Sequence, residues 1–264
     1  MNEAAQDSSV TVRPVVLVPT YNNPDTLREV VKRAREHIPD VIVVDDGSSD
    51  PAKSIADKLA SEGLAHLHRR SENGGKGAAV KDGLATASEL GYTHALQVDA
   101  DLQHELADIP KFLEIAQEKP DALVLASPVF DDSAPWIRLM ARKITRFWVH
   151  VQTGGRVITD PMCGFRLYPL ARALAVRVRG NAMDFDPEIA VRMQWDGTPI
   201  VNLPTRVRYN EGGVSHFRQI RDNGLLTWMH IRLTTAAILY HLPRRFFRWV
   251  FGRKKSSTES ADVH

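Results

Sequence analysis

Short hydrophobic runs alternate with amphipathic stretches along the first 130 residues. The runs are Val15–Val18, Val41–Val44, Ala65–His68, Ala95–Val98 and Leu123–Ala126, of which Ala65–His68 is the least apolar. Most of them are continuously apolar, which is typical of parallel strands covered on both faces. The pattern therefore predicts βαβ units, and with them an α/β fold whose mainly parallel sheet is flanked by helices.

The stretches between and after these runs have helical spacing, and the regular alternation weakens after about Ser127. One further strand is expected at Ile200–Tyr209. The predicted helices are Pro24–Glu36, Asp50–Ser61, Gly77–Leu90, Glu105–Glu118, Pro135–Gln152, Arg166–Val178 and Asp184–Trp195.

Composition narrows the class of protein. The chain has 264 residues, of which 43% are hydrophobic and 25% charged, as in a folded globular protein. Its single cysteine, Cys163, excludes an intrachain disulfide framework and a cysteine zinc site, and favours a reducing compartment. We read no signal peptide in the polar start and no 18-residue apolar run, so no membrane span is predicted.

Charge is concentrated near the C-terminus. Residues 217–255 contain nine Lys or Arg against one acid, together with seven aromatic side chains. We interpret residues 218–255 as basic amphipathic helices that associate with an anionic membrane surface. Nucleic acid, packing on the domain and a dimer contact are the alternatives. Residues 13–217 would form the domain, with disordered ends at 1–12 and 256–264.

Polar side chains follow three of the predicted strands. They lie in Pro19–Asn22, Asp45–Ser48 and Asp99–His104, and include four carboxylates. Ligands of open α/β sheets bind beyond the carboxyl ends of the strands. Gathering this much negative charge is costly unless a cation or a ligand rich in donors is bound there.

Asp99, Asp101 and Gln103 offer oxygen ligands within one tight turn. Oxygen ligands suit Mg²⁺ or Mn²⁺, which would hold a diphosphate; a solvated loop that caps a helix is the alternative. After the second predicted strand, Val41–Val44, Asp46 could accept a hydrogen bond from a nucleotide base, or it could belong to a simple turn.

Further along the chain lie other polar candidates. Lys76 lies in the glycine-rich helix entry NGGKG, which could meet phosphate or sugar oxygens or be an ordinary turn. Asp186 and Glu188 at a helix start could act as a general base, and so could Asp160, unless these acids only stabilise the local structure. His216 ends a glycine loop, EGGVSH, that could close over a ligand.

Seven motifs in order carry a family resemblance: VPTYNN, VVDDGSSD, NGGKGAA, QVDADLQH, DPMCGFRLYP, FDPEIAVRMQWDG and EGGVSHFR. The set resembles the family 2 glycosyltransferases of the GT-A fold, above all the polyprenol-phosphate sugar synthases of the dolichol-phosphate mannose type. The resemblance runs from Val15 to about Phe217. We therefore expect a GT-A (nucleotide-diphospho-sugar transferase) fold with a C-terminal amphipathic helical extension.

The resemblance implies an inverting transferase that takes a sugar from a nucleotide diphosphate sugar, such as a UDP- or GDP-sugar, with Mg²⁺ or Mn²⁺ on the diphosphate. The acceptor would be polyprenyl phosphate or another lipid-linked molecule. The candidate metal ligands are Asp99, Asp101 and Gln103, and the candidate catalytic residues are Asp101, Asp186, Glu188 and Asp160. The candidate nucleotide-sugar contacts are Pro19, Thr20, Tyr21, Val44, Asp46, Lys76, Asp99, Ala100, Asp101, Arg166 and His216.

Two other functions compete with this interpretation. A nucleotidyltransferase also uses carboxylates and Mg²⁺, although Pro19–Asn23 has no Lys or Arg to hold a triphosphate. A non-enzymatic membrane-associated binding module would use only the basic tail. For the favoured transferase we expect a cytoplasmic protein, peripheral on the inner face of the cytoplasmic membrane, with no nucleic-acid partner. The sequence leaves the oligomeric state open.

Overall fold

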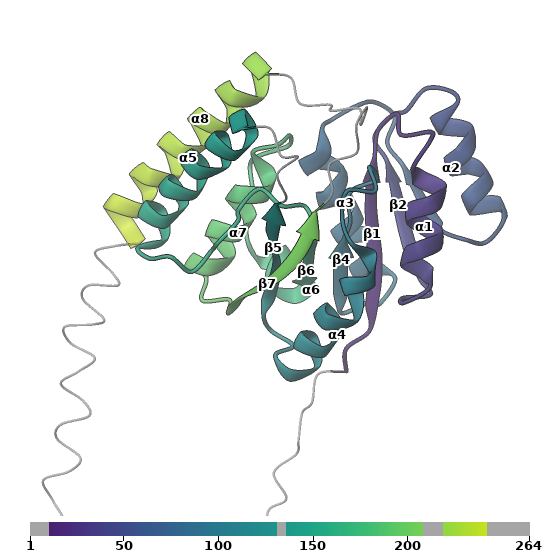
Figure 1. Ribbon diagram of the computed structural model, residues 1–264, viewed down its shortest axis with the longest axis horizontal. Coiled ribbons are helices and arrows are strands. Elements are labelled where there is room, and N and C mark those ends of the chain that lie inside the picture. The colour runs from purple at the N-terminus through teal and green to yellow at the C-terminus, as the bar shows by residue number, and fades with distance from the viewer. Residues whose placement is uncertain (1–10, 131–135, 208–218, 242–264) are drawn as a thin grey trace, which may run out of the picture.

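A seven-stranded mixed sheet forms the centre of the computed structural model, which describes residues 11–130, 136–207 and 219–241 (Figure 1). The strand order is β3-β2-β1-β4-β6-β5-β7, and every pairing is parallel except those of β6. The strands are β1 (Pro14–Thr20), β2 (Val41–Asp45), β3 (His66–Arg69), β4 (His94–Gln97), β5 (Leu123–Phe130), β6 (Arg166–Pro169) and β7 (Ile200–Val207).

Helices cover both faces of this sheet. The first layer contains α1 (Leu27–Arg35), α2 (Ala52–Ser61), the short 3₁₀ helix η1 (Leu106–Asp108) and α4 (Ile109–Glu118). The second contains α3 (Lys76–Glu89), α5 (Trp136–Thr153), α6 (Leu170–Ala175), α7 (Phe185–Trp195), α8 (Gln219–Ala236) and the π-helical turn η2 (Ala237–His241). The α/β fold with a mainly parallel sheet is thereby confirmed.

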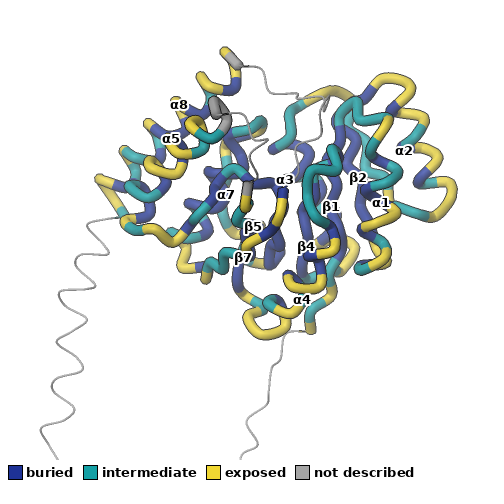
Figure 2. Tube along the Cα trace, viewed as in Figure 1, coloured by how far each residue is buried: buried dark blue, intermediate teal, exposed yellow. Residues whose placement is uncertain are grey.

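The strands with continuous apolar runs contact the helices on both faces of the sheet. In β1, Val15 and Leu17 contact the core around α3 and α7, while Val16 and Val18 contact the core around α1 and α4. Successive side chains of a strand point to opposite faces, so a strand buried on both sides is apolar throughout. The central strands are accordingly buried, and exposure is confined mainly to the outer helices and loops (Figure 2).

The helix predicted at Arg166–Val178 is wrong in its first part. Residues Arg166–Pro169 form β6, which lies antiparallel between β4 and β5, and only Leu170–Ala175 is helical. Pro169 disfavours a helix through this segment and instead forms the N-cap of α6, while pairing with two neighbours buries every residue of the strand. Because β6 runs in reverse, its first residues lie at the edge where its parallel neighbours end.

The helices α5 and α8 lie side by side at one end of the molecule (Figure 1). The side chain of Gln152 on α5 donates to His230 Nδ1 and to Thr234 Oγ1 on α8, both at 3.1 Å. On the same helix Arg232 forms an ion pair with Glu188 of α7 at 2.7 Å. The first part of the predicted C-terminal extension is thus helical and packed on the domain. Within the described residues no helix is long and apolar enough to cross a bilayer.

The two predicted disordered ends and the segment after His241 lie mostly or wholly outside the described residues. The division into domain, amphipathic extension and disordered ends therefore stays a prediction.

Candidate active site

The turn after β4 carries the D-x-D pair at the carboxyl edge of the sheet. The Oδ1 atom of Asp99 lies 2.7 Å from Nζ of Lys76, and Oδ2 lies 3.6 Å from Nε2 of His104. Asp101 accepts a hydrogen bond from the Gln103 backbone N–H at 3.1 Å, and Leu102 has a positive φ of 59° that closes the turn. This loop therefore holds two carboxylates near a cationic side chain.

Lys76 is the first residue of α3 and links the D-x-D turn to a third carboxylate. Its Nζ lies 3.0 Å from Oδ2 of Asp186, at the start of α7. Burial lowers the pKa of Lys76, but Asp186 and Asp99 raise it well above its ordinary range, so the side chain stays protonated. Burial raises the pKa of Asp99, yet Lys76 and His104 hold that pKa well below its usual value.

The donor set fits a divalent cation in part. Burial and the neighbouring charge of Asp99 raise the pKa of Asp101, so a cation beside the pair would be favoured electrostatically. In the parts of the chain that the structure describes, no three carboxylate, imidazole or thiol groups converge in a way that could hold a metal. Asp99, Asp101 and Gln103 would thus need additional oxygens, as Mg²⁺ and Mn²⁺ commonly receive from substrate phosphates.

The loop before β6 closes the cluster from another side. A Cβ atom added at Gly164 would lie 2.5 Å from Asp99 Oδ1 and 2.6 Å from Lys76 Nζ. Arg166 is completely buried behind this contact and donates to the carbonyl oxygens of Cys163, Asp186 and Pro161 at 2.5–2.6 Å. This geometry favours a supporting role for Arg166; the predicted contact with the nucleotide sugar stays untested.

Asp46 is buried at the end of β2 and is already bound by protein groups. Its carboxylate accepts hydrogen bonds from the backbone N–H groups of Gly74 and Gly75 at 2.9 and 2.8 Å, and Arg70 lies 2.8 Å away. Burial raises the pKa of Asp46, and these three partners oppose that rise. The glycine-rich entry to α3 thus donates two amides to Asp46, and a base would have to use the remaining acceptor capacity of its oxygens.

The other predicted nucleotide contacts occupy the same edge of the sheet. The ends of β1 and β2 are tied together, because Asn22 donates its backbone N–H to Ser48 Oγ at 2.9 Å and accepts from the Ser49 backbone at 3.0 Å. Of these predicted contacts, Pro19, Thr20, Val44 and Ala100 are buried and Tyr21 is partly buried.

Two of the candidate bases are bound by side chains other than Lys76. Glu188 is two residues beyond Asp186 and therefore faces another side of α7, where it binds Arg192, Arg232 and the Gly180 N–H at 2.7–2.9 Å. Asp160 accepts from the backbone N–H groups of Met162 and Cys163 and pairs with Arg142 of α5 at 2.6 Å. Both carboxylates thus already have cationic partners.

Cys163 is buried in the core, and burial raises its pKa to about 12, as expected for a packing residue. His216 and the glycine loop before it lie outside the described residues.

The sequence analysis did not predict the basic side chains that form ion pairs with the acids at the strand ends. Arg69 pairs with Asp45 at 2.9 Å, and Arg70 pairs with Asp46 and with Asp82. Both arginines lie at the end of β3, so applying the strand-end rule to this third strand would have found them.

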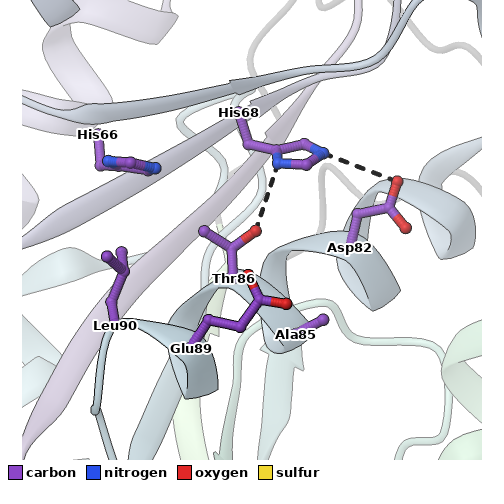
Figure 3. A pocket seen from close by; sticks show the side chains of 7 residues that line it. All are labelled: His66, His68, Asp82, Ala85, Thr86, Glu89 and Leu90. Atoms are coloured by element: carbon purple, nitrogen blue, oxygen red, sulfur yellow. Dashed lines mark hydrogen bonds and ion pairs between the residues drawn. The ribbon is translucent and has the colours of Figure 1, made fainter.

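A separate hollow lies on the β3 edge, between β3 and the C-terminal half of α3 (Figure 3). His68 contacts Thr86 and faces Asp82 there, and His66 lies beside it. The hollow is wide open and takes no part in the D-x-D cluster, so we do not place the active site in it.

Fold and site define a class of protein: an α/β domain of the GT-A type with carboxylates at the strand ends. A profile of "Glycosyl transferase family 2" matches residues 15–172. The chain belongs to this family and is a glycosyltransferase, which overturns the nucleotidyltransferase and non-enzymatic alternatives.

Curated relatives extend this result. The chain is 28% identical to polyprenol monophosphomannose synthase of Mycolicibacterium smegmatis over 81% of its own length and 85% of the relative's. It is also 28% identical to undecaprenyl-phosphate mannosyltransferase of Micrococcus luteus, over 77% and 87%. A crystal structure of Mycobacterium tuberculosis glucosyl-3-phosphoglycerate synthase with Mn²⁺ and UDP-glucose matches with a TM-score of 0.65 at 14% identity, covering 86% of this chain and 79% of that one. That match confirms the GT-A fold.

Proposed function

We propose that this protein transfers a sugar, with inversion, from a nucleotide diphosphate sugar to polyprenyl phosphate at a membrane surface. The observation that carries the proposal is the contact of Lys76 with Asp99 and Asp186 beside Asp101, at the carboxyl edge of a family 2 sheet. A site of this kind suits a diphosphate together with a divalent cation. Relatives that are named for polyprenol and undecaprenyl phosphate support the choice of acceptor.

The state of the candidate bases also favours a phosphate acceptor. Asp160 is paired with Arg142, Asp186 with Lys76, and Glu188 with Arg192 and Arg232. Each of these carboxylates is thus already engaged by a cationic side chain of the protein. A hydroxyl acceptor needs a base to remove its proton, whereas a phosphate monoester is ionised at neutral pH and needs none.

The reaction would be a single displacement. An oxygen of the acceptor phosphate forms a bond to the anomeric carbon, the bond to the diphosphate oxygen breaks, and the diphosphate leaves with the electron pair. A divalent cation held by Asp99, Asp101 and Gln103 would stabilise the charge on the leaving group. Lys76 would add a second positive charge beside the diphosphate, and Asp46 would contribute to binding the base.

A direct test combines ligand binding with transfer. Purified protein is heated with UDP, GDP and their sugar conjugates, with and without Mn²⁺ or Mg²⁺, and a specific ligand should raise the melting temperature with its concentration. Sugar transfer to polyprenyl phosphate in vesicles is then measured with the nucleotide that binds. Asp101→Ala should abolish transfer and leave the melting temperature of the free protein nearly unchanged.

The matched control is Asp121→Ala, which removes a carboxylate that is 61% exposed and far along the chain from the D-x-D turn. It should retain full transfer. Normal transfer by Asp101→Ala would reject the assignment of the metal site, and the absence of any nucleotide effect on wild-type protein would reject the donor.

Attachment to an anionic membrane is part of the proposal, and the outward faces of α5 and α8 support it. Large apolar side chains are exposed there, among them Phe147 at 59% and Trp228 at 63%, and the basic side chains of Lys143 and Arg146 are exposed beside Phe147. Aromatic residues interleaved with basic ones suit the interface of a bilayer with anionic lipids.

Sedimentation with vesicles tests this attachment. Wild-type protein should bind vesicles that contain phosphatidylglycerol better than purely zwitterionic ones, and Phe147→Glu or Trp228→Glu should weaken the binding. Leu174→Glu, on the exposed side of α6, is the control that should bind normally. Equal binding of all variants would reject this face as the attachment surface.

A further inference from the structure

The ammonium group of Lys76 contacts two carboxylates that come from different elements. Asp99 is a candidate metal ligand on the D-x-D turn, whereas Asp186 belongs to α7. Only 17% of the Lys76 side chain and 5% of the Asp186 side chain are exposed, so the Lys76–Asp186 contact is shielded from water. Charges in such surroundings interact more strongly than charges at the surface.

Asp186 is fixed from behind. Arg166 donates to the backbone carbonyl of Asp186 at 2.5 Å, and its guanidinium lies 3.8 Å from the Asp186 carboxylate. The Oδ1 atom of Asp186 is buried without a hydrogen-bond partner. This carboxylate therefore has little freedom to move toward an acceptor, and its principal close partner is the Lys76 ammonium.

The position of Lys76 sets up a competition. The ammonium lies 2.7 Å from an oxygen of Asp99, and a divalent cation bound to that oxygen would be repelled by the positive charge of Lys76. A diphosphate near the same point would instead be attracted by it. The same side chain should thus oppose the metal alone and favour the nucleotide diphosphate.

We infer that Asp186 is a positioning residue rather than a general base: it holds Lys76 at the D-x-D turn, where Lys76 competes with the metal for Asp99 and binds the diphosphate of the donor. The diphosphate half of this inference rests on the proposed function. The competition for Asp99 requires only that the free protein binds a divalent metal.

The experiment measures two affinities of the full-length protein. Binding of Mn²⁺ to the free protein is followed by the loss of the free-ion electron paramagnetic resonance signal, and binding of UDP or GDP in saturating Mn²⁺ by calorimetry. Lys76→Met should bind Mn²⁺ about tenfold more tightly or better, and the nucleotide about tenfold more weakly. Damage to the fold would instead weaken both.

Asp186→Asn tests the positioning role. Without its second partner, Lys76 should pair with Asp99 alone, so both Mn²⁺ and nucleotide should bind several-fold more weakly. The circular dichroism spectrum should match wild type, which separates this result from damage to the fold. Lys76→Arg keeps the charge and should keep the weak Mn²⁺ binding of wild type, which separates charge from shape. Lys58→Met on α2 and Asp196→Asn at the other end of α7 are exposed control positions and should leave both affinities unchanged.

The two proposals fail in different ways. Unchanged or weaker Mn²⁺ binding by folded Lys76→Met would overturn the competition, whatever the nucleotide does. Unchanged affinities in Asp186→Asn would overturn the positioning role. If wild-type protein bound Mn²⁺ but no nucleotide, the proposed donor would be wrong, while the Mn²⁺ measurements would still decide the competition.

Discussion

The α-carbon of Gly164 faces the carboxylate of Asp99 so closely that no side chain fits between them. A Cβ at position 164 would lie 2.5 Å from Oδ1 of Asp99 and 2.6 Å from Nζ of Lys76. The restriction is one of space, because Gly164 does not have a positive φ. Glycine is therefore required there so that the loop before β6 can approach the D-x-D turn.

Gly164→Ala should disable the site while leaving the protein folded. The added methyl group must displace Asp99 and Lys76, so we expect Mn²⁺-dependent nucleotide binding to fall by tenfold or more. Calorimetry measures the binding, and circular dichroism checks the fold. Gly155→Ala is the matched control, because a Cβ there meets only Val157 Cγ2, at an ordinary 3.8 Å. Normal binding by Gly164→Ala would show that the turn tolerates the shift.

Replacing Asp46 by Asn should cost stability as well as binding. The Asn side chain has only one oxygen, so its NH₂ group would face the backbone N–H of Gly74 or Gly75. The ionic contact with Arg70 would also be lost. We expect the free energy of unfolding to fall by about 1–3 kcal/mol in urea titrations. Asp57→Asn, whose side chain is 53% exposed, should cost about 1 kcal/mol or less. Equal losses in both variants would contradict the buried role of Asp46.

The ion pair of Arg232 with Glu188 should anchor α8 to the domain. Glu188 is fully buried and keeps Arg192 and Gly180 as partners when Arg232 is removed. Arg232→Met should therefore cost about 2–3 kcal/mol, somewhat less than the loss of a sole partner. Faster amide exchange confined to α8 would accompany this loss. Arg221→Met, an exposed change on the same helix, should have little effect, and an equally small effect of Arg232→Met would reject the anchor.

His230 should make the stability depend on pH. It is buried against Gln152, and burial lowers its pKa from the ordinary 6.5 to about 4. The unfolded chain binds a proton near pH 6.5 that the folded protein does not accept until about pH 4. The contribution of His230 is therefore complete above pH 6.5 and is lost as the pH falls toward 4, by up to about 3 kcal/mol.

Urea unfolding at several pH values measures this dependence, and His230→Leu should reduce the slope between pH 6.5 and 4. His150→Leu, which replaces a partly exposed histidine on α5, is the comparison. An unchanged slope in His230→Leu would show that other groups account for the acid sensitivity.

Most of the fold could be predicted because local and global signals agree. The runs at Val15–Val18 and Val41–Val44 are too apolar for anything but doubly covered strands, and each became one. Arg166–Pro169 could not be assigned in this way. These residues form a strand because they pair with β4 on one side and β5 on the other, and both partners are distant in the chain.

In the candidate site, too, some features followed from local sequence patterns and others did not. The strand-end rule brought Asp46 and Asp99 to one edge of the sheet, as expected. It could not reveal that Lys76 lies between Asp99 and Asp186, or that Glu188 faces away from them. These relations depend on the angle at which α7 meets α3, which no local pattern encodes.

The reversed strand β6 also has a consequence for the order in which the protein can assemble. The β1–β2 and β2–β3 pairings join strands close in sequence, whereas β1 pairs Pro14 with β4 at His94, β6 pairs His94 with Pro169, and β5 pairs Leu123 with Ile200. Such distant pairings form slowly because long loops must close first. Asp46 and Asp99 belong to the early part of the chain, while Gly164 and Asp186 belong to the late part. We expect a refolding chain to acquire its affinity for nucleotide only in its last kinetic phase, so that ligand binding reports completed folding.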